Sequence, residues 1–104
     1  MADAARALDA LGDTTRRAIV ELLASGPRSV GDLADRLPVS RPAVSQHLRR
    51  LTDAGLVTSD ASGTRRIYRL QPEGIATVRS YLDEMWGVAA SRFALFAENT
   101  GRTK

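Results

Sequence analysis

The chain has 104 residues, of which 43% are apolar, and it contains no cysteine. A chain of this length forms one small domain, 1–104, whose high surface-to-volume ratio makes stabilisation by a partner subunit common. Without cysteine there are no disulfides or thiolate metal ligands, and the single histidine, His47, cannot build a multi-histidine site. No run of apolar residues is long enough to span a membrane, and the first residues do not resemble a secretory signal. We therefore expect a cytoplasmic protein with no membrane partner.

The net charge of +3 is unevenly distributed along the chain. Residues 38–70 contain six arginines and two aspartates, a net charge of +4, whereas the remainder contains nine basic and ten acidic residues. Fourteen of the fifteen basic residues are arginine, which suits bidentate contacts to phosphate or guanine, although codon usage can give the same count. This concentration of positive charge indicates a polyanionic partner.

Two helices are expected in the first quarter of the chain. The first covers Asp3–Leu11 and ends at Gly12. The second covers Thr14–Ser25, because Asp13 is a good N-cap and the Gly26-Pro27 pair is a stop signal. Both helices precede the basic part of the chain.

A third and a fourth helix are expected at Val30–Leu37 and Arg41–Ala54. Ser29 begins the third helix with the spacing of a capping box, and Ser40 caps the fourth. Only three residues separate the two helices. Residues 29–54 therefore fit a helix-turn-helix.

The next segment, residues 56–70, changes from helical to strand periodicity. Residues 56–60 and 65–70 are short and rich in β-branched and aromatic side chains, and the sequence ASGT lies between them. This pattern predicts a β-hairpin with Gly63 at its turn and two arginines just past its tip.

The last expected helix runs from Pro72 to about Glu98, a length of about 40 Å at 1.5 Å per residue. One apolar stripe contains Ile75, Val78, Leu82, Trp86, Ala89, Phe93 and Phe96, and further apolar residues beside it are Tyr81, Met85, Val88 and Leu95. A helix on a domain surface needs only one stripe. We therefore expect this helix to pack on its own domain and on a second copy of the chain, rather than to form a ligand pocket.

The fourth expected helix has two different faces. On a helical wheel the inward residues are Val44, Leu48 and Leu51, the opposite residues are Pro42, Ser45, Gln46 and Arg49, and Arg50 and His47 lie to the sides. A helix in the DNA major groove needs such a face, because small residues allow close approach, glutamine reads adenine, and arginine contacts guanine or phosphate. Ser40 and the free N–H groups of the first turn can bind a phosphate. The hairpin arginines Arg65 and Arg66 can reach a narrow minor groove.

Each of these features also has a simpler interpretation. A polar helix face with arginine is more often a solvated surface, two arginines at a hairpin often serve solubility, and His47 is equally suited to a structural role. The order of the elements decides between the interpretations. A helix-turn-helix followed by a basic hairpin predicts a winged helix-turn-helix, a mainly α fold with a small β-hairpin wing, which binds double-stranded DNA.

The same residues resemble the ArsR/SmtB family of bacterial repressors. The similar stretches are ALGDTTRRAIVELLASGPRSVGDLADRL, PVSRPAVSQHLRRLTDAGLV and GTRRIYRL, which cover residues 7–70. The resemblance implies a homodimer that binds a palindromic operator and represses transcription, often of its own gene. It also implies that Ser45, Gln46 and His47 face bases, that Arg41, Arg49 and Arg50 contact phosphate, and that Arg65, Arg66 and Tyr68 form the wing contact.

In this family the dimer is joined through the first and last helices, here 1–11 and 72–98. The interface residues that the resemblance implies are Leu8, Leu11, Leu82, Met85, Trp86, Ala89, Phe93 and Phe96.

The sequence departs from the metal-sensing members of the family. Those members carry a cysteine motif in the helix before the recognition helix, where this chain has SVGDLADRL, or histidine and acidic ligands in the last helix. Here the last helix offers Asp83, Glu84 and Glu98 without histidine, a set that would bind only a hard cation weakly. We predict no metal site and no cofactor. The inducer stays open between a small molecule, a partner protein and none.

Three other functions are compatible with parts of the pattern. A winged helix can be a protein-interaction module through the same faces, and an activator can bind DNA in the same way as a repressor. A hydrolase or transferase is the weakest alternative, because no Ser-His-acid arrangement, phosphate loop or carboxylate pair is apparent. We predict a DNA-binding repressor that is not an enzyme.

Overall fold

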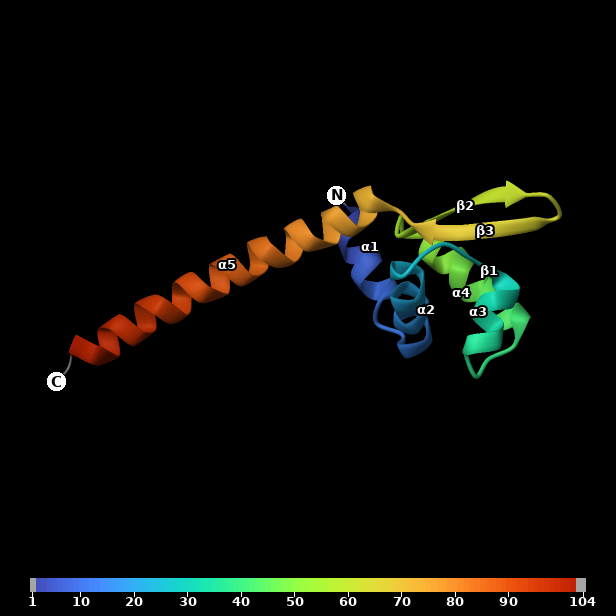
Figure 1. Cartoon of the computed structure of the whole chain (residues 1–104). Helices are drawn as coiled ribbons and strands as arrows, with labels where there is room; N and C mark the ends of the chain where they lie inside the picture. The colour runs from blue at the N-terminus through green and yellow to red at the C-terminus, as the bar shows by residue number, and fades with distance from the viewer. Residues whose placement is uncertain (1, 103–104) are drawn as a thin grey trace.

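The computed structural model describes the backbone of residues 2–102 and the side chains of residues 4–97. Its elements are α1 (Ala2–Ala10), α2 (Thr14–Ala24), β1 (Arg28–Ser29), α3 (Val30–Arg36), α4 (Arg41–Asp53), β2 (Val57–Ser62), β3 (Arg65–Leu70) and α5 (Pro72–Arg102) (Figure 1). The winged helix-turn-helix that the sequence predicts is confirmed. Three details differ: the last helix continues to Arg102 instead of ending near Glu98, the first strand of the hairpin continues to Ser62 instead of residue 60, and a short strand, β1, precedes α3.

Three helices begin at the side-chain caps that the sequence indicates. In each case a side-chain oxygen accepts a hydrogen bond from a backbone N–H group of the first turn, which has no partner within the helix. The pairs are Asp13 Oδ2 with Arg16 N at 2.9 Å, Ser29 Oγ with Asp32 N at 3.1 Å, and Ser40 Oγ with Ala43 N at 3.3 Å. These local bonds explain why the helix starts were predictable.

The core lies where α2, α3 and α4 meet beneath the wing. The largest fully buried side chains are Ile19, Leu33, Val44, Leu48, Leu51 and Leu56. Burying an aliphatic side chain of this size contributes about 1.5–3 kcal/mol, so this cluster holds α3 and α4 together. It thereby fixes which face of α4 points to solvent.

The wing is a β-hairpin of β2 and β3 in antiparallel register. Val57 pairs with Leu70 at its base and Ser62 pairs with Arg65 at its tip. Gly63 lies in the turn with φ of 65°, a conformation that glycine adopts without the steric cost of a side chain. The tip of the hairpin points away from α5 (Figure 1).

Strand β1 pairs with β3 to give a three-stranded antiparallel sheet in the order β1-β3-β2. Arg28 pairs with Tyr68, and Ser29 pairs with Ile67. Two residues are too few to show an alternation of apolar and polar side chains, so the sequence pattern did not indicate this strand. It matters because it ties the start of α3 to the wing.

Helix α5 begins in close contact with the end of α4. Gly55, with φ of 79°, ends α4, and a Cβ on Gly74 would lie 1.8 Å from the carbonyl oxygen of Gly55. The N–H of Gln71 also donates to the carbonyl of Leu56 at 2.8 Å. Only glycine at position 74 permits this approach of the two backbones.

Most of α5 projects away from the rest of the domain (Figure 1). Its first turns pack against α1, and Val78 is its last buried side chain within the part whose side chains are described. From Tyr81 to Ala97 every described side chain is exposed. In the described part of the chain, no helix combines the length and apolarity needed to cross a membrane.

Candidate nucleic-acid interface

The outer face of α4 carries the polar residues that the sequence placed there. Val44, Leu48 and Leu51 are fully buried. Ser45, Gln46 and Arg49, which we call the recognition face, are exposed, as is Arg50 beside them. The recognition face is therefore free to contact a partner along the length of the helix.

The N-terminal end of α4 is also exposed at Ser40, Arg41 and Pro42. The hydroxyl of Ser40 is used as the helix cap. Arg41 extends over the start of α3, because a Cβ on Gly31 would lie 3.0 Å from Arg41 Nη2. Arg41 thus points its charge towards the space between α3 and the wing.

An open hollow in this space brings together three of the arginines predicted to contact DNA. Arg41 comes from α4, whereas Arg65 and Arg66 come from the wing. We call it the wing hollow; its lining is Ser29, Val30, Gly31, Asp32, Asp35, Arg41, Thr64, Arg65 and Arg66. The two aspartates partly offset its charge, so the hollow is cationic mainly on its α4 and wing sides.

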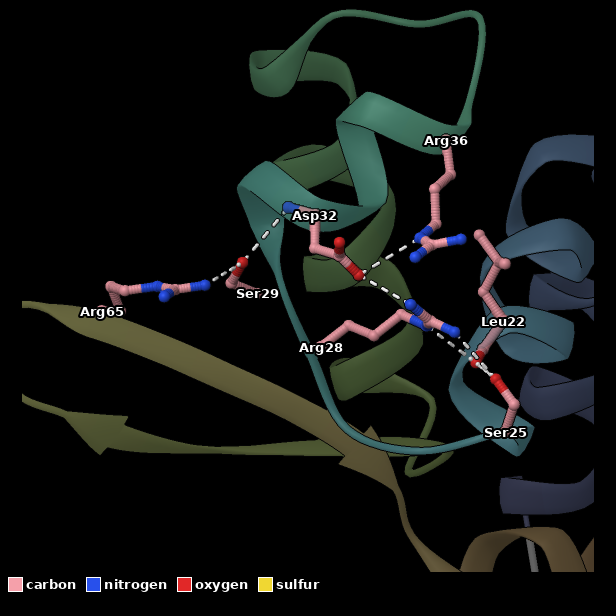
Figure 2. A network of polar contacts seen from close by, with 7 residues as sticks. All are labelled: Leu22, Ser25, Arg28, Ser29, Asp32, Arg36 and Arg65. Carbon is pink, nitrogen blue, oxygen red and sulfur yellow. Dashed lines mark hydrogen bonds and ion pairs between the residues drawn. The ribbon is translucent and has the colours of Figure 1, made fainter.

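A hydrogen-bonded network holds the wing against α3 (Figure 2). Arg65 Nη2 donates to Ser29 Oγ at 2.9 Å, and the same oxygen accepts from the backbone N–H of Asp32. Ser29 is buried, with 7% of its surface exposed. One wing arginine is therefore anchored to the N-cap of α3.

The network continues from Asp32 to the end of α2 (Figure 2). Arg28 Nη1 donates to Asp32 Oδ2 at 2.7 Å, and Arg36 Nε lies 3.4 Å from the same oxygen. The hydrogen bond from Arg28 is the main reason that the pKa of Asp32 lies below its ordinary value. Arg28 also donates to the carbonyl of Leu22 and the hydroxyl of Ser25. The network thus joins α2, β1, α3 and β3.

The other polar side chains of the wing differ in their surroundings. Arg66 is exposed and donates to Ser59 Oγ at 3.0 Å, and Arg69 pairs with Asp60 across the hairpin. Tyr68 is half-buried and packs against the core, so only part of its side chain can reach a ligand. Arg66 is thus exposed for a contact, and the roles of Arg65, Arg66 and Tyr68 in DNA binding stay predictions.

His47 lies beside the N-terminus of α2 rather than fully on the recognition face. Its Nδ1 is 3.3 Å from Arg16 Nη1 and 3.8 Å from Asp13 Oδ2, and 22% of its side chain is exposed. Arginine can only donate, so Nδ1 of His47 is the acceptor of any hydrogen bond that Arg16 makes to the ring. These contacts give His47 a structural role, and the exposed edge leaves a base contact as a prediction.

Arg16 also lies in this region, although the sequence pattern indicated no role for it. Its backbone N–H donates to the carboxylate of Asp13, the N-cap of α2, and this hydrogen bond lowers the pKa of that carboxyl below its ordinary value. Its Nε donates to the carbonyl of Ala10 at 2.6 Å. Arg16 and His47 are 31 positions apart and lie on two different helices, so no local pattern could have indicated that they meet.

The residues predicted for the dimer interface fall into two groups. Leu8 and Leu11 of the first segment are half-buried against the core of their own domain. The residues on α5 are exposed: Leu82 at 42%, Met85 at 51%, Trp86 at 74%, Phe93 at 72% and Phe96 at 68%, with Ala89 among them. So large an apolar surface on one helix is typical of an interaction site.

Within the described residues no group of three or more histidine, cysteine, aspartate or glutamate side chains is arranged to hold a metal ion. The absence of a metal site and of a cofactor stays a prediction from the sequence.

Comparisons with known proteins agree with this architecture. Residues 13–59 match the family described as "Bacterial regulatory protein, arsR family". The arsenical resistance operon repressor of Escherichia coli is 34% identical over 93 residues, which are 88% of this chain and 80% of that protein. A homodimeric winged helix-turn-helix DNA-binding domain from Mycobacterium bovis, described as a possible ArsR-family transcriptional regulator, has a TM-score of 0.67 at 30% identity, covering 82% of this chain and 79% of that one.

A further relative covers nearly the whole chain. The HTH-type transcriptional regulator Rv2034 of Mycobacterium tuberculosis is 54% identical over 96 residues, which are 92% of this chain and 90% of that protein. Similarity of this extent includes α5 as well as the helix-turn-helix and the wing. The chain therefore belongs to the arsR family of bacterial regulatory proteins.

Proposed function

We propose that the chain is a transcriptional repressor that binds an inverted-repeat operator in DNA as a homodimer. The exposed recognition face of α4 carries this proposal. Ser45 and Gln46 are short or flexible polar side chains near the start of the helix, and Arg49 follows one turn later. In the major groove such a face hydrogen-bonds base edges, and each good base contact contributes about 1–3 kcal/mol of discrimination.

The arginines around α4 supply affinity rather than sequence preference. Arg41 and the wing arginines converge from one side, and Arg50 extends beside the recognition face. Contacts of arginine to phosphate release counterions from DNA, so the affinity falls with salt by a slope of about 0.9 for each phosphate contacted. We expect binding to weaken steeply as the salt concentration rises.

Dimerisation is supported by the exposed apolar surface of α5. Trp86 and Phe93 are both more than 70% exposed, which is unusual for aromatic side chains in a lone domain. The similar domain from M. bovis is a homodimer. A two-fold axis through paired α5 helices would set two copies of α4 in successive major grooves, about 34 Å apart.

Repression follows from occupancy of the promoter. The similar protein from E. coli is named as the repressor of an operon. A dimer that covers two successive turns of DNA excludes RNA polymerase from the same site. We propose that the operator lies upstream of the protein's own gene, so that the protein limits its own synthesis.

The test is binding of the full chain to DNA from its own upstream region, followed by fluorescence anisotropy across salt concentrations. We expect one inverted repeat to bind far more tightly than a scrambled duplex, with a steep negative salt slope. The Arg65→Ala, Arg66→Ala double variant should bind all sequences more weakly. A folded dimer that binds no DNA at low salt would refute the proposal and favour a protein-interaction module.

A further inference from the structure

We propose that Arg16 of α2 is a DNA-binding residue, which holds one backbone phosphate together with Arg50 of α4. The inference rests on the proposed DNA-binding function and extends it to a helix outside the helix-turn-helix and the wing. The ligand is a phosphodiester of the operator backbone. The contact would position α4 on DNA without reading its sequence.

The site is a second open hollow, which we call the α2 hollow. It is lined by Arg16, Ala43, Gln46, His47 and Arg50. Gln46 belongs to the recognition face, so whatever binds in this hollow lies beside the bases that the face would contact. Two guanidinium groups line the hollow, and no carboxylate does so among the described residues. An anion is the ligand that such a lining favours.

The guanidinium of Arg16 is held in place before any ligand arrives. Its Nε donates to the carbonyl of Ala10 at 2.6 Å, and its Nη1 lies 3.3 Å from Nδ1 of His47. A guanidinium has five donor hydrogens, so these two contacts leave three for a phosphate. Because the side chain is already ordered, binding costs less conformational entropy than it would for a free arginine.

The charge around the two arginines is not symmetrical. Arg16 and Arg50 also line a neighbouring hollow on the side of α1, where Asp9 and Asp53 are present. On the recognition side the nearby carboxylate is Asp13, which lies 3.8 Å from His47 Nδ1 but does not line the α2 hollow. The positive charge is therefore least compensated on the side that faces the recognition face.

Helix α4 contributes Arg41 to the wing hollow, and it contributes Ala43, Gln46, His47 and Arg50 to the α2 hollow. Arg41 of the wing hollow and Arg50 of the α2 hollow are nine residues apart, which is about 13.5 Å along a helix. The major groove is about 12 Å wide between its two backbones. Arg41 and Arg50 are thus far enough apart along α4 to contact two different phosphates, so each hollow can hold a phosphate of its own.

The experiment compares Arg16→Gln with a matched control, Arg17→Gln, in the full chain. Arg17 is the neighbouring residue of α2, is exposed, and lines none of the described hollows. Because Arg50 still contacts the same phosphate, Arg16→Gln should reduce the salt slope by at most about one for each protomer, and it should weaken binding to operator and random DNA by the same factor, about tenfold or more. Arg17→Gln should change neither quantity beyond a small general charge effect.

A second measurement locates the phosphate. Operator duplexes with a single neutral methylphosphonate at each position are titrated with the wild-type protein, Arg16→Gln and Arg50→Gln. We expect one position at which the neutral linkage weakens the wild type most, weakens each single variant less, and has no further effect on the double variant Arg16→Gln, Arg50→Gln. The double variant should then lose less than the sum of the single losses, because both arginines contact the same group.

Structural effects are separated from DNA contact in two ways. Thermal unfolding shows whether each variant is folded. If Arg16→Gln does not fold, Arg16→Lys replaces it, because lysine keeps the positive charge. The Arg16→Lys variant should keep the salt slope of the wild type but bind DNA less tightly. If Arg16 acted only through His47, Arg16→Gln would have no effect in a His47→Ala background, and the inference would be wrong.

Two further results would overturn the inference. One is an unchanged salt slope in Arg16→Gln while Arg50→Gln weakens binding, and the other is an equal loss in Arg17→Gln. Failure of the wild-type dimer to bind any DNA would refute the proposed function itself, an outcome that is distinct from both.

Discussion

Arg65 of the wing donates a hydrogen bond of 2.9 Å to the hydroxyl of Ser29, which is also the N-cap of α3. One buried oxygen therefore both starts a helix of the helix-turn-helix and anchors the wing. Because the two bonds share one acceptor, the orientation of the wing is coupled to the helix that supports α4.

We predict that Ser29→Ala lowers the free energy of unfolding by about 1–2 kcal/mol, since it removes a helix cap and leaves the Arg65 guanidinium without this partner. Urea denaturation followed by circular dichroism measures the change. Ser62→Ala is the matched control, because Ser62 is exposed in the wing and its effect should stay within about 0.5 kcal/mol. Equal stabilities of the two variants would show that the Ser29 hydroxyl does not hold this region together.

The contact of Gly74 with Gly55 gives a second prediction. A Cβ at position 74 would lie 1.8 Å from a backbone oxygen, so Gly74→Ala must displace the start of α5 and should cost about 1–3 kcal/mol of stability. A Cβ at position 87 would have no neighbouring atom within 4 Å, so Gly87→Ala should stabilise the helix by about 0.5–1 kcal/mol. Thermal unfolding of both variants measures the two changes in stability, which should have opposite signs. Destabilisation by both substitutions, or by neither, would contradict the prediction.

The exposed face of α5 gives a third prediction, for the oligomeric state. Trp86→Glu and Phe93→Glu should each shift the protein from dimer to monomer, because a charge would be buried in the paired helices. Sedimentation velocity measures the mass in solution. Ser91→Glu is the control, since Ser91 lies two residues before Phe93 and faces another side of the helix. A wild-type monomer, or a dimer that survives both changes, would rule out this interface.

The fourth prediction concerns the dependence of stability on pH. The pKa of Asp32 is lowered by the hydrogen bond from Arg28, and that of Asp13 by the N–H of Arg16. A carboxyl with a lowered folded-state pKa stabilises the fold above its ordinary value of about 4, and this contribution is lost as the pH falls through the lowered value. Stability should therefore decrease on acidification below about pH 4.

The variant Asp32→Asn should be less stable than the wild type at neutral pH, and its stability should fall less between about pH 7 and about pH 3. Urea denaturation at the two pH values gives the free energy of unfolding of each protein at neutral pH and its loss on acidification. Glu21→Gln serves as the comparison, because Glu21 is exposed and forms no ion pair among the described residues. An identical pH dependence in wild type and Asp32→Asn would show that Asp32 contributes nothing to it.

The parts of the fold that the sequence predicted are those determined by local chemistry. The caps at Asp13, Ser29 and Ser40 mark helix starts through bonds that span three residues. The apolar spacing of Val44 and Leu48 indicates which face of α4 is buried. The recognition face could be predicted because it is simply the opposite side of the same helix.

The features that the sequence did not indicate depend on contacts between distant segments. The meeting of Arg16 with His47, and that of Arg65 with Ser29, each joins two elements whose separation no periodicity encodes. The approach of Gly74 to Gly55 is likewise visible only in three dimensions. The first two of these contacts place α2 and the wing beside the polar face of α4, and they thereby determine which residues border the candidate site.

The measurement that tests the central claim most directly is a selection of bound sequences from random DNA, made with the wild type and with Gln46→Ala. Gln46 is exposed on α4 and forms no hydrogen bond through its side chain with the other described residues. We predict an inverted repeat with half-sites one helical turn apart, about 10–10.5 base pairs, and a loss of preference at one position of each half-site in the variant. The same motif with the same ranking of sequences in both proteins would contradict the assignment of the recognition face.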